Sequence, residues 1–288
     1  MADKCLIGGL NWIWEDEDVA FSGGDWVATD TVKVANLLNT RPGSYARTTS
    51  DDTVDTALTV TFSDDRLIDH IFFGCTNASD AGTVTVIADG DTIASGHALV
   101  PTTHTPSGGY IAFGRTSAAG KVPTDERGAN GVSSLLVLDD AVAVTELVLQ
   151  FSDTANPDGY FQIGQLWAGM SVRPSIPPVA GAFTIGTIEE SRRRRSLGGT
   201  LHSRRLWSRR RITAVLEYQP EAEALPIWSE LVARLGGTQP FLFSQLAPDG
   251  IAAIDQHRTT ILGVLEEPTA VEHQVHDMWR WSMSIVEL

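Results

Sequence analysis

The chain has 288 residues, of which 42% are hydrophobic and 20% charged, and its formal net charge is −15 at pH 7. No stretch approaches the roughly 18–20 apolar residues of a membrane-spanning helix. The first residues lack the basic start and the long apolar run of a secretory signal peptide. Since a domain usually has about 100–200 residues, we expect a globular two-domain protein that is made in a cytoplasm.

Charge is distributed unevenly along the chain. Residues 1–175 contain 23 acids and nine bases, whereas residues 176–288 contain 13 acids and 12 bases. The change coincides with three prolines in the segment 174–178, and proline removes backbone donors and favours an extended chain. This boundary predicts three segments: a first domain at 1–173, a linker at 174–178 and a second domain at 179–288.

The first domain shows the alternation of short β-strands. Leu58, Val60 and Phe62 alternate with Thr59 and Thr61, which predicts a half-buried strand. Asp, Asn and Gly clusters separate similar runs, while 32–38 predicts a short helix and 96–130, rich in Pro and Gly, predicts long loops. The further strands are expected at 67–73, 83–88, 134–138, 146–151 and 161–167. Many short strands without alternating helices predict an antiparallel jelly-roll sandwich.

The second domain combines strands with one helix. Apolar residues recur at helical spacing over 222–235, with Pro226 in the first turn and Gly236 after the last. The strands are expected at 182–188, 200–207, 211–218, 241–246, 259–265 and 278–286. This pattern predicts a mostly antiparallel α+β domain whose helix packs on a sheet.

No catalytic signature occurs in the sequence. A nucleophile elbow, a phosphate-binding loop, a zinc-protease motif and a dinucleotide fingerprint are all missing. His273 and His276 form the one close histidine pair, and the acidic runs at 15–18 and 51–55 lack the spacing of an EF-hand. The two cysteines lie 70 residues apart, which favours free thiols over a disulfide framework. We expect no enzyme activity, no cofactor and no metal site.

Three tryptophans, Trp12, Trp14 and Trp26, lie in loop-like sequence beside acids. Exposed tryptophans can stack on sugar rings, but tryptophans are also large core residues. A carbohydrate site is therefore one hypothesis, with Trp12, Trp14, Trp26 and Arg47 as its candidate residues. Core packing is the alternative for the tryptophans.

Nine arginines lie between Ser191 and Arg211 without an intervening acid. They are Arg192, Arg193, Arg194, Arg195, Arg204, Arg205, Arg209, Arg210 and Arg211. We place the first four in a turn and the others at the ends of two hairpin strands. Nucleic-acid binding is disfavoured, because the whole chain is acidic and the arginines are not interleaved with glycine or aromatic residues. We predict a contact with an acidic face of a neighbouring subunit; a solvated hairpin is the alternative.

Several stretches of the first domain carry a family resemblance. They are NLLNTRPGSYART at 36–48, LTVTF at 58–62, LIDHIFFGCTN at 67–77, GTVTV at 82–86 and YFQIGQLWAG at 160–169. This series resembles the galactose-binding-like, discoidin-type jelly rolls found in minor tail proteins of tailed bacteriophages.

The second domain has a resemblance of its own. A hairpin is followed by a helix containing Trp228-Ser229-Glu230-Leu231 and then by GGTQPFLF at 236–243. This is similar to the tail-tube-like β-sandwich with one flanking helix, which builds tube rings and the distal tail protein. Distal tail proteins usually place the tube-like domain first, with the sugar-binding-like domain after or within it, so the order expected here is reversed.

The two resemblances imply a structural protein of a phage or phage-derived tail tip. Its expected partners are further copies in a ring of three or six, the tail tube, the tape-measure protein and the hub or baseplate proteins, and its expected location is the virion. The alternative is a receptor-binding tail component whose jelly roll binds host-surface carbohydrate. A glycan-active enzyme is a third hypothesis, which requires two opposed carboxylates that the sequence does not single out.

Overall fold

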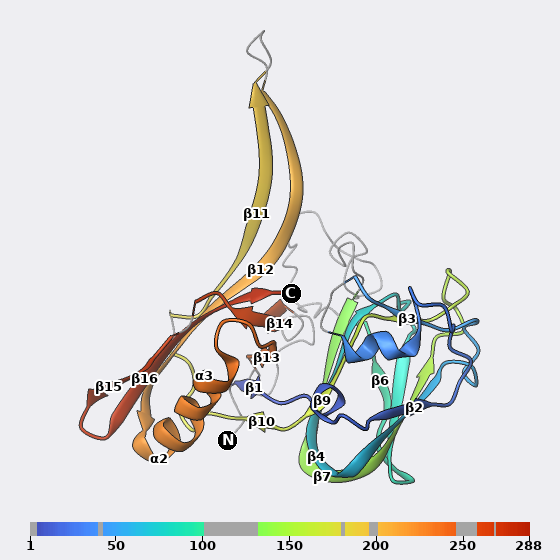
Figure 1. Cartoon of the computed structure of the whole chain (residues 1–288), viewed down its shortest axis with the longest axis horizontal. Helices are drawn as coiled ribbons and strands as arrows, with labels where there is room; N and C mark the ends of the chain where they lie inside the picture. The colour runs from blue at the N-terminus through green and yellow to red at the C-terminus, as the bar shows by residue number, and fades with distance from the viewer. Residues whose placement is uncertain are drawn as a thin grey trace, which may run out of the picture. The chain divides into compact units, whose positions relative to one another are not determined.

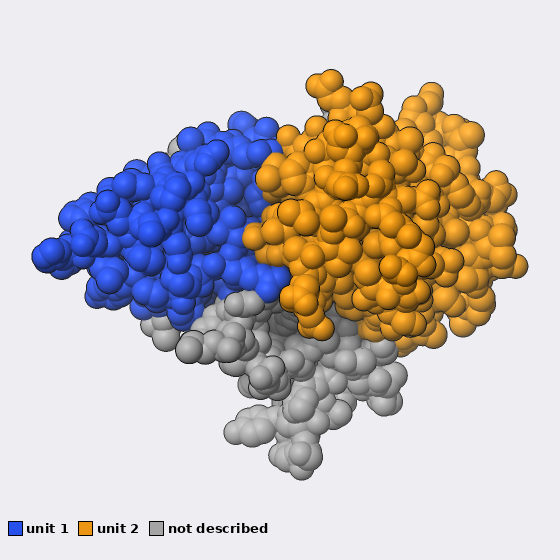
Figure 2. Space-filling view, turned by 90° about the horizontal axis from the view of Figure 1, so that it is seen from below, with its two compact units in different colours: residues 1–9, 172–248, 259–288 blue, residues 10–171, 249–258 orange. Residues whose placement is uncertain are grey.

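The structure, a computed structural model, describes residues 5–39, 43–100, 132–179, 182–195, 201–245, 258–267 and 269–288, without the side chains of 190–208. The chain forms two compact units, coloured separately in Figure 2. Unit 1 comprises Met1–Gly9, Val172–Pro248 and Thr259–Leu288, and unit 2 comprises Leu10–Ser171 and Asp249–Arg258. Both are built mainly from antiparallel strands, which confirms the predicted fold class.

Unit 2 contains a six-stranded sheet in the order β2-β4-β7-β5-β6, with β9 beside β4, and a two-stranded sheet of β3 and β8. The strands are β2 (Ala20–Ser22), β3 (Ala46–Arg47), β4 (Ala57–Thr76), β5 (Thr83–Ala88), β6 (Asp91–Ala98), β7 (Val132–Ser152), β8 (Gln162–Ile163) and β9 (Gln165–Gly169). The strand predicted from the alternation at Leu58–Phe62 and the one predicted at 67–73 are thus one strand, and those predicted at 134–138 and 146–151 are another.

Strands β4 and β7 bend together, as Figure 1 shows. Their pairing shifts register between Thr61 and Arg66 and again between Ile68 and His70. Before the bend β4 also pairs with β2, and after it β4 also pairs with β9. Side chains from both halves, such as Val60 and Phe73, enter one buried core. The bend therefore folds a single hydrogen-bonded ladder into the two layers of a sandwich.

A short N-terminal segment closes unit 2. Helix α1 (Trp12–Glu15) begins at Asn11, whose side-chain oxygen accepts from the Ile13 amide at 3.2 Å. The Asn11 amide also donates to the Leu166 carbonyl at 3.1 Å, and its oxygen accepts from the Ala168 amide at 3.0 Å. One buried side chain thus joins the start of unit 2 to β9 near its end. The helix predicted at 32–38 is a 3₁₀ helix, η1 (Val34–Leu38).

Unit 1 is an eight-stranded sheet in the order β10-β1-β13-β14-β16-β12-β11, with β15 beside β16. The strands are β1 (Leu6–Gly8), β10 (Ser171–Val172), β11 (Thr184–Arg195), β12 (Leu201–Pro220), β13 (Phe241–Ser244), β14 (Thr260–Leu265), β15 (Val271–Val275) and β16 (Met278–Glu287). In β16, Trp281, Met283 and Ile285 are buried, as their alternation with polar residues predicts.

One continuous helix covers this core. It consists of α2 (Glu221–Glu223), a π-helical turn η2 (Ala224–Trp228) and α3 (Ser229–Leu235). Pro226 lies inside the π turn. Proline has no N–H to donate to the preceding turn, and the π turn interrupts the α-helical hydrogen bonds at this position. Trp228 packs on Trp281 with ring centroids 5.9 Å apart. Among the described helices, none is long and apolar enough to cross a membrane.

The N-terminal strand changes the predicted division of the chain. Residues 1–173 were expected to form one domain, but β1 pairs with β13, and Cys5 and Ile7 are buried in the core of unit 1. Unit 2 is therefore inserted into unit 1, rather than preceding it. The return to unit 1 at Val172 lies next to the predicted linker at 174–178.

Strands β11 and β12 form a ribbon that is longer than the predicted hairpin. The two strands pair from Thr184 opposite Thr213 to Arg195 opposite Leu201, with a bulge after Glu190. Strand β16 pairs with β12 only from Arg211 onward. Between Thr187 and Arg210 the described ribbon therefore has two strands and no third. Arg192–Arg195 were expected in a turn, but they continue β11 because the pairing resumes after the bulge.

Replacing a side chain of β1 tests its assignment to unit 1. Ile7→Ala should lower the stability of unit 1 by about 2–4 kcal/mol, because it removes a buried side chain from a packed core. We expect faster amide hydrogen exchange in β13 and β14 and unchanged exchange in β4 and β7. Ile185→Ala, at a position 49% exposed in β11, is the matched control. Faster exchange in β4 and β7 with unchanged β13 would contradict the assignment.

Candidate functional site

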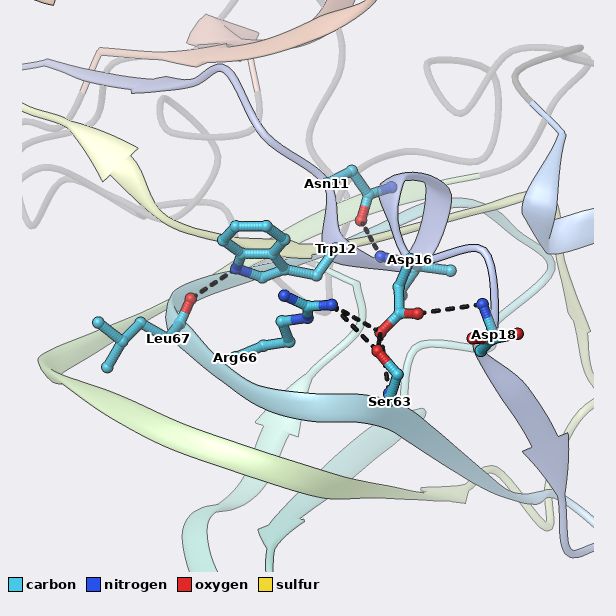
Figure 3. A network of polar contacts seen from close by, with 8 residues as sticks. Asn11, Trp12, Asp16, Asp18, Ser63, Arg66 and Leu67 are labelled. Carbon is cyan, nitrogen blue, oxygen red and sulfur yellow. Dashed lines mark hydrogen bonds and ion pairs between the residues drawn. The ribbon is translucent and has the colours of Figure 1, made fainter.

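Trp12 is held against β4 rather than free to stack on a ligand (Figure 3). Its indole N–H donates to the Leu67 carbonyl at 2.8 Å. The Arg66 guanidinium lies over its ring, 5.1 Å from the centroid. The half-buried indole therefore already has a hydrogen-bond acceptor and a cation-π partner within unit 2.

Asp16 anchors the same network (Figure 3). One carboxylate oxygen accepts from the Ser63 amide and hydroxyl, both at 2.9 Å, and from Arg66 Nη2 at 3.2 Å. The other oxygen accepts from the Asp18 amide at 3.1 Å. Burial alone would raise the pKa of Asp16, but these hydrogen bonds outweigh burial and lower its pKa below the usual value.

Trp14 is also committed to the interior. Its indole N–H donates to the Leu37 carbonyl at 2.8 Å. Its ring meets Trp167 edge to face, with centroids 5.1 Å apart. Trp14 therefore joins α1 to η1 and β9, and core packing explains its position.

Trp26 and Arg47 lie on neighbouring segments: Arg47 ends β3, and the Val27 amide donates to its carbonyl at 2.9 Å. The Trp26 N–H donates to the Ala57 carbonyl at 2.8 Å, and its backbone bridges to Thr48. The Arg47 guanidinium lies over the Tyr160 ring, 4.7 Å from the centroid. Of the four predicted carbohydrate residues, Trp12 and Trp14 thus lie on α1, whereas Trp26 and Arg47 lie on two neighbouring segments at β3.

Tyr160 was not among the predicted site residues. It follows the turn 156–159, and its carbonyl accepts from Asn77 Nδ2 at 3.0 Å, as does Asp158 Oδ2. This arrangement places a half-buried arginine, a tyrosine ring and an exposed carboxylate at neighbouring positions. The Asn-Pro-Asp-Gly turn before Tyr160 is the sequence signal for a loop that carries a functional side chain.

The arginine cluster divides into a paired base and a ribbon. Arg210 Nε donates to Glu287 Oε1 at 2.9 Å, and its backbone amide donates to Oε2 of the same residue at 3.1 Å. Arg211 forms an ion pair with Glu266 and donates to Ser284 Oγ at 3.0 Å. The charges of both arginines are therefore met inside unit 1.

The remaining arginines of β11 and the distal part of β12 lie in the two-stranded ribbon. They are Arg192, Arg193, Arg194, Arg195, Arg204 and Arg205; Arg209, opposite Ile188, lies in the ribbon between these six and the base. Arg192 is the cross-strand partner of Arg204, and Ser191 that of Arg205. Like charges at directly opposite positions destabilise a β-ribbon.

Asp69, His70 and Ser171 form a buried polar group where the chain leaves unit 2. Asp69 accepts from the Ser171 amide at 2.9 Å and from its hydroxyl at 2.5 Å, and it bonds His70 Nδ1 at 2.6 Å. The serine hydroxyl is bound to the carboxylate and not to the imidazole. The order is therefore not that of a catalytic triad, in which histidine activates serine.

His97 lies in a half-buried contact with Ser134. Burial lowers its pKa. Its Nε2 lies 2.8 Å from Ser134 Oγ, and that hydroxyl donates to the Ala98 carbonyl at 3.0 Å. Because the hydroxyl proton is used, the Nε2–H of His97 donates to Ser134.

The two histidines of the predicted pair have different surroundings, and the two cysteines are not bonded to each other. The His273 ring packs on Trp279 at 5.1 Å, whereas His276 is 94% exposed in the turn before β16. Cys5 and Cys75 are free thiols, and burial raises the pKa of Cys5 far above its usual value. Within the described ranges, no three His, Cys, Asp or Glu side chains are grouped closely enough to hold a metal ion.

Asp16→Asn tests the network around α1. The lowered pKa stabilises the native state above the ordinary aspartate value of 3.8, and this contribution is lost as the pH falls through the folded pKa. We expect the variant to be about 1–3 kcal/mol less stable at pH 7. Its stability should also fall less than that of the wild type on acidification, as measured by urea unfolding at several pH values. Asp18→Asn, with an exposed side chain, is the control; parallel pH curves for Asp16→Asn and wild type would contradict this role.

Comparison with known proteins gives a similarity of fold. No protein-family model and no curated protein matches the sequence. A family 32 carbohydrate-binding module from Clostridium perfringens NanJ, solved with galactose, matches 57% of this chain and 98% of its own, with 10% identity and a TM-score of 0.33. A module from a family 31 glycoside hydrolase of the same organism matches 54% and 96%, with 8% identity and a TM-score of 0.33. A fucolectin from striped bass (Morone saxatilis) serum matches 96% and 92%, with 9% identity and a TM-score of 0.32.

Proposed function

We propose that this protein is a structural component of the tail tip of a tailed phage or a phage-derived particle. In this role, copies of the chain form a ring that joins the tail tube to the baseplate or hub. Unit 1 acts as the tail-tube-like domain, and unit 2 is a galactose-binding-like jelly roll carried by it. Its partners are further copies, tube, tape-measure and hub proteins, its location is the virion, and the role requires no catalysis.

The observation that carries this proposal is the two-stranded ribbon of β11 and β12. A ribbon without a third strand is marginally stable in water by itself. Arginine occupies positions 192–195, 204 and 205 of the ribbon, and no acid occurs between Ser191 and Arg211. Such a ribbon gains stability from a surface of opposite charge, and a neighbouring subunit can supply that surface.

The insertion of unit 2 into unit 1 supports the same proposal. Distal tail proteins, which the sequence resembles, place the sugar-binding-like domain after or within the tube-like domain. Because β1 pairs with β13, unit 2 lies within the chain of unit 1. The reversed order expected from the sequence is thereby removed as an objection.

A second candidate function is binding of host-surface carbohydrate by unit 2. Arg47 over the ring of Tyr160, next to the exposed carboxylate of Asp158, offers the donors, acceptor and aromatic face that sugars bind. This site differs from the predicted one, since Trp12 and Trp14 are committed elsewhere. Receptor binding and ring formation are compatible, because the residues of the carbohydrate site are not those of the ribbon.

Ring formation is tested by the mass of the purified chain in solution. Light scattering and negative-stain images should show rings of three or six copies at moderate salt. Arg193→Glu with Arg204→Glu should weaken assembly at least tenfold while the melting temperature stays within a few degrees, since both positions lie in the ribbon.

Arg210→Glu is the contrasting variant. It faces Glu287 within unit 1, so we expect it to lower the melting temperature rather than to act on assembly alone. A wild-type chain that remains monomeric at all concentrations, or a ribbon variant that assembles normally, would contradict the assembly role.

Carbohydrate binding is tested with a glycan array followed by titration of the best glycan. Arg47→Ala should weaken binding at least fivefold, because it removes the charged donor beside Tyr160. Lys33→Ala is the control, since Lys33 pairs with Asp30 instead. The carbohydrate role fails if no glycan binds, or if Arg47→Ala binds as well as the wild type.

A further inference from the structure

Seven exposed carboxylates of unit 2 lie near the bend of β4 and β7 and near the turn between β5 and β6. The residues of this acidic rim are Glu17, Asp18, Asp64, Asp65, Asp89, Asp91 and Glu146. Hydrogen bonds place them together: Thr145 Oγ1 donates to Asp65 at 2.6 Å, and the Thr145 and Glu146 amides donate to Asp89 Oδ1 at 3.2 and 2.7 Å. Asp64 follows Ser63, whose amide donates to Asp16. Glu17 and Asp18, which follow Asp16 in the chain, therefore lie near Asp64. Asp91 is the first residue of β6, directly after the two-residue turn Asp89-Gly90.

The rim has no base of its own to balance it. Of its seven acids, none forms an ion pair with a base in the part of the chain that the structure describes. The neighbouring Arg66 is already bound to Asp16 and stacked on Trp12. Seven exposed negative charges near one another repel, so the rim favours a cationic partner.

The ribbon carries the opposite charge. Arginine occupies six positions, 192–195, 204 and 205, and no acid occurs between Ser191 and Arg211. The pairing of β11 and β12 puts Arg192 opposite Arg204. Arginine binds carboxylates through its planar, bidentate fork, so several such pairs together suit a stable contact better than one exposed pair does.

We infer that the ribbon of one copy binds the acidic rim of a second copy. This inference rests on the proposed function, to which it adds the partner surface. The two surfaces are complementary, six positive against seven negative charges, and every copy carries both. Because the ribbon belongs to unit 1 and the rim to unit 2, the contact is between two different patches. Such heterologous contacts build closed rings or open filaments rather than two-fold dimers.

Paired charge reversals in the full-length chain test the inference. The ribbon variant is Arg192→Glu with Arg204→Glu, and the rim variant is Asp64→Lys with Asp91→Lys, at exposed positions. Each variant alone should assemble at least tenfold more weakly than the wild type in sedimentation velocity. An equimolar mixture should regain assembly, because the glutamates of one variant meet the lysines of the other. Alternating copies close a ring of six but not one of three.

The matched control is Asp51→Lys with Asp140→Lys, which changes the net charge equally outside the rim. It should assemble as the wild type does. Asp64→Asn with Asp91→Asn provides a milder rim variant with an intermediate loss, should the lysines disturb folding. Assembly should also weaken between 0.1 and 0.5 M salt, at about the concentrations where the Debye length falls below 10 Å.

The outcomes separate this inference from the proposed function. A monomeric wild-type chain would overturn both. If the wild type forms rings and the ribbon variant does not, but the rim variant assembles like its control, ring formation stands and the rim is not the partner surface. If the wild type forms rings of six, failure of the mixture to regain assembly would also overturn the pairing of ribbon and rim. Tight binding of duplex DNA by the ribbon, with rim variants unaffected, would assign the arginines to nucleic acid instead.

Discussion

The buried side chain of Asn11 joins the two ends of unit 2, and the insertion of that unit depends on this joint. Its amide and its oxygen bond the backbone of β9 at Leu166 and Ala168. Gly169 completes the joint, because a Cβ at that position would collide with the Leu10 carbonyl. A domain can be inserted into another when its ends lie close together. Since the ends of unit 2 meet, the chain can leave unit 1 after β1 and return to the same sheet at β10.

The strongest periodic patterns of the sequence predicted their elements well, and the failures have local causes. The helix expected at 222–235 is observed at 221–235, because its buried stripe is long. Strand β1 has only three residues, and its partner β13 lies more than 200 residues away, so no pattern in the sequence marks the pairing. Ser63-Asp64-Asp65 has turn composition, yet it bends a continuous strand, since Asp16 and Thr145 bind its polar groups.

The candidate sites were harder to predict than the fold. The sequence left two roles open for the tryptophans, core packing and sugar stacking. The hydrogen-bond partner of each indole distinguishes between them. Trp12, Trp14 and Trp26 all donate to backbone carbonyls 23 to 55 residues away along the chain. Arg210 likewise finds Glu287 only because β12 pairs with β16. Residue type showed which groups were available, but tertiary pairing determined which of them remained for binding.

The arrangement of charge along β12 explains why one arginine cluster serves two purposes. At the base of the ribbon, β16 and the residue after β14 provide Glu287 and Glu266, so Arg210 and Arg211 brace the sheet. From Arg210 toward the tip of the ribbon, no described third strand pairs with β12, and the stretch between Ser191 and Arg211 contains no acid. Arg192 opposite Arg204 therefore makes the isolated ribbon less stable than one with neutral pairs. On our proposal this cost is recovered in the assembly, where carboxylates of another copy replace those that β16 provides at the base. The ribbon would then be most ordered in the ring, which couples its folding to assembly.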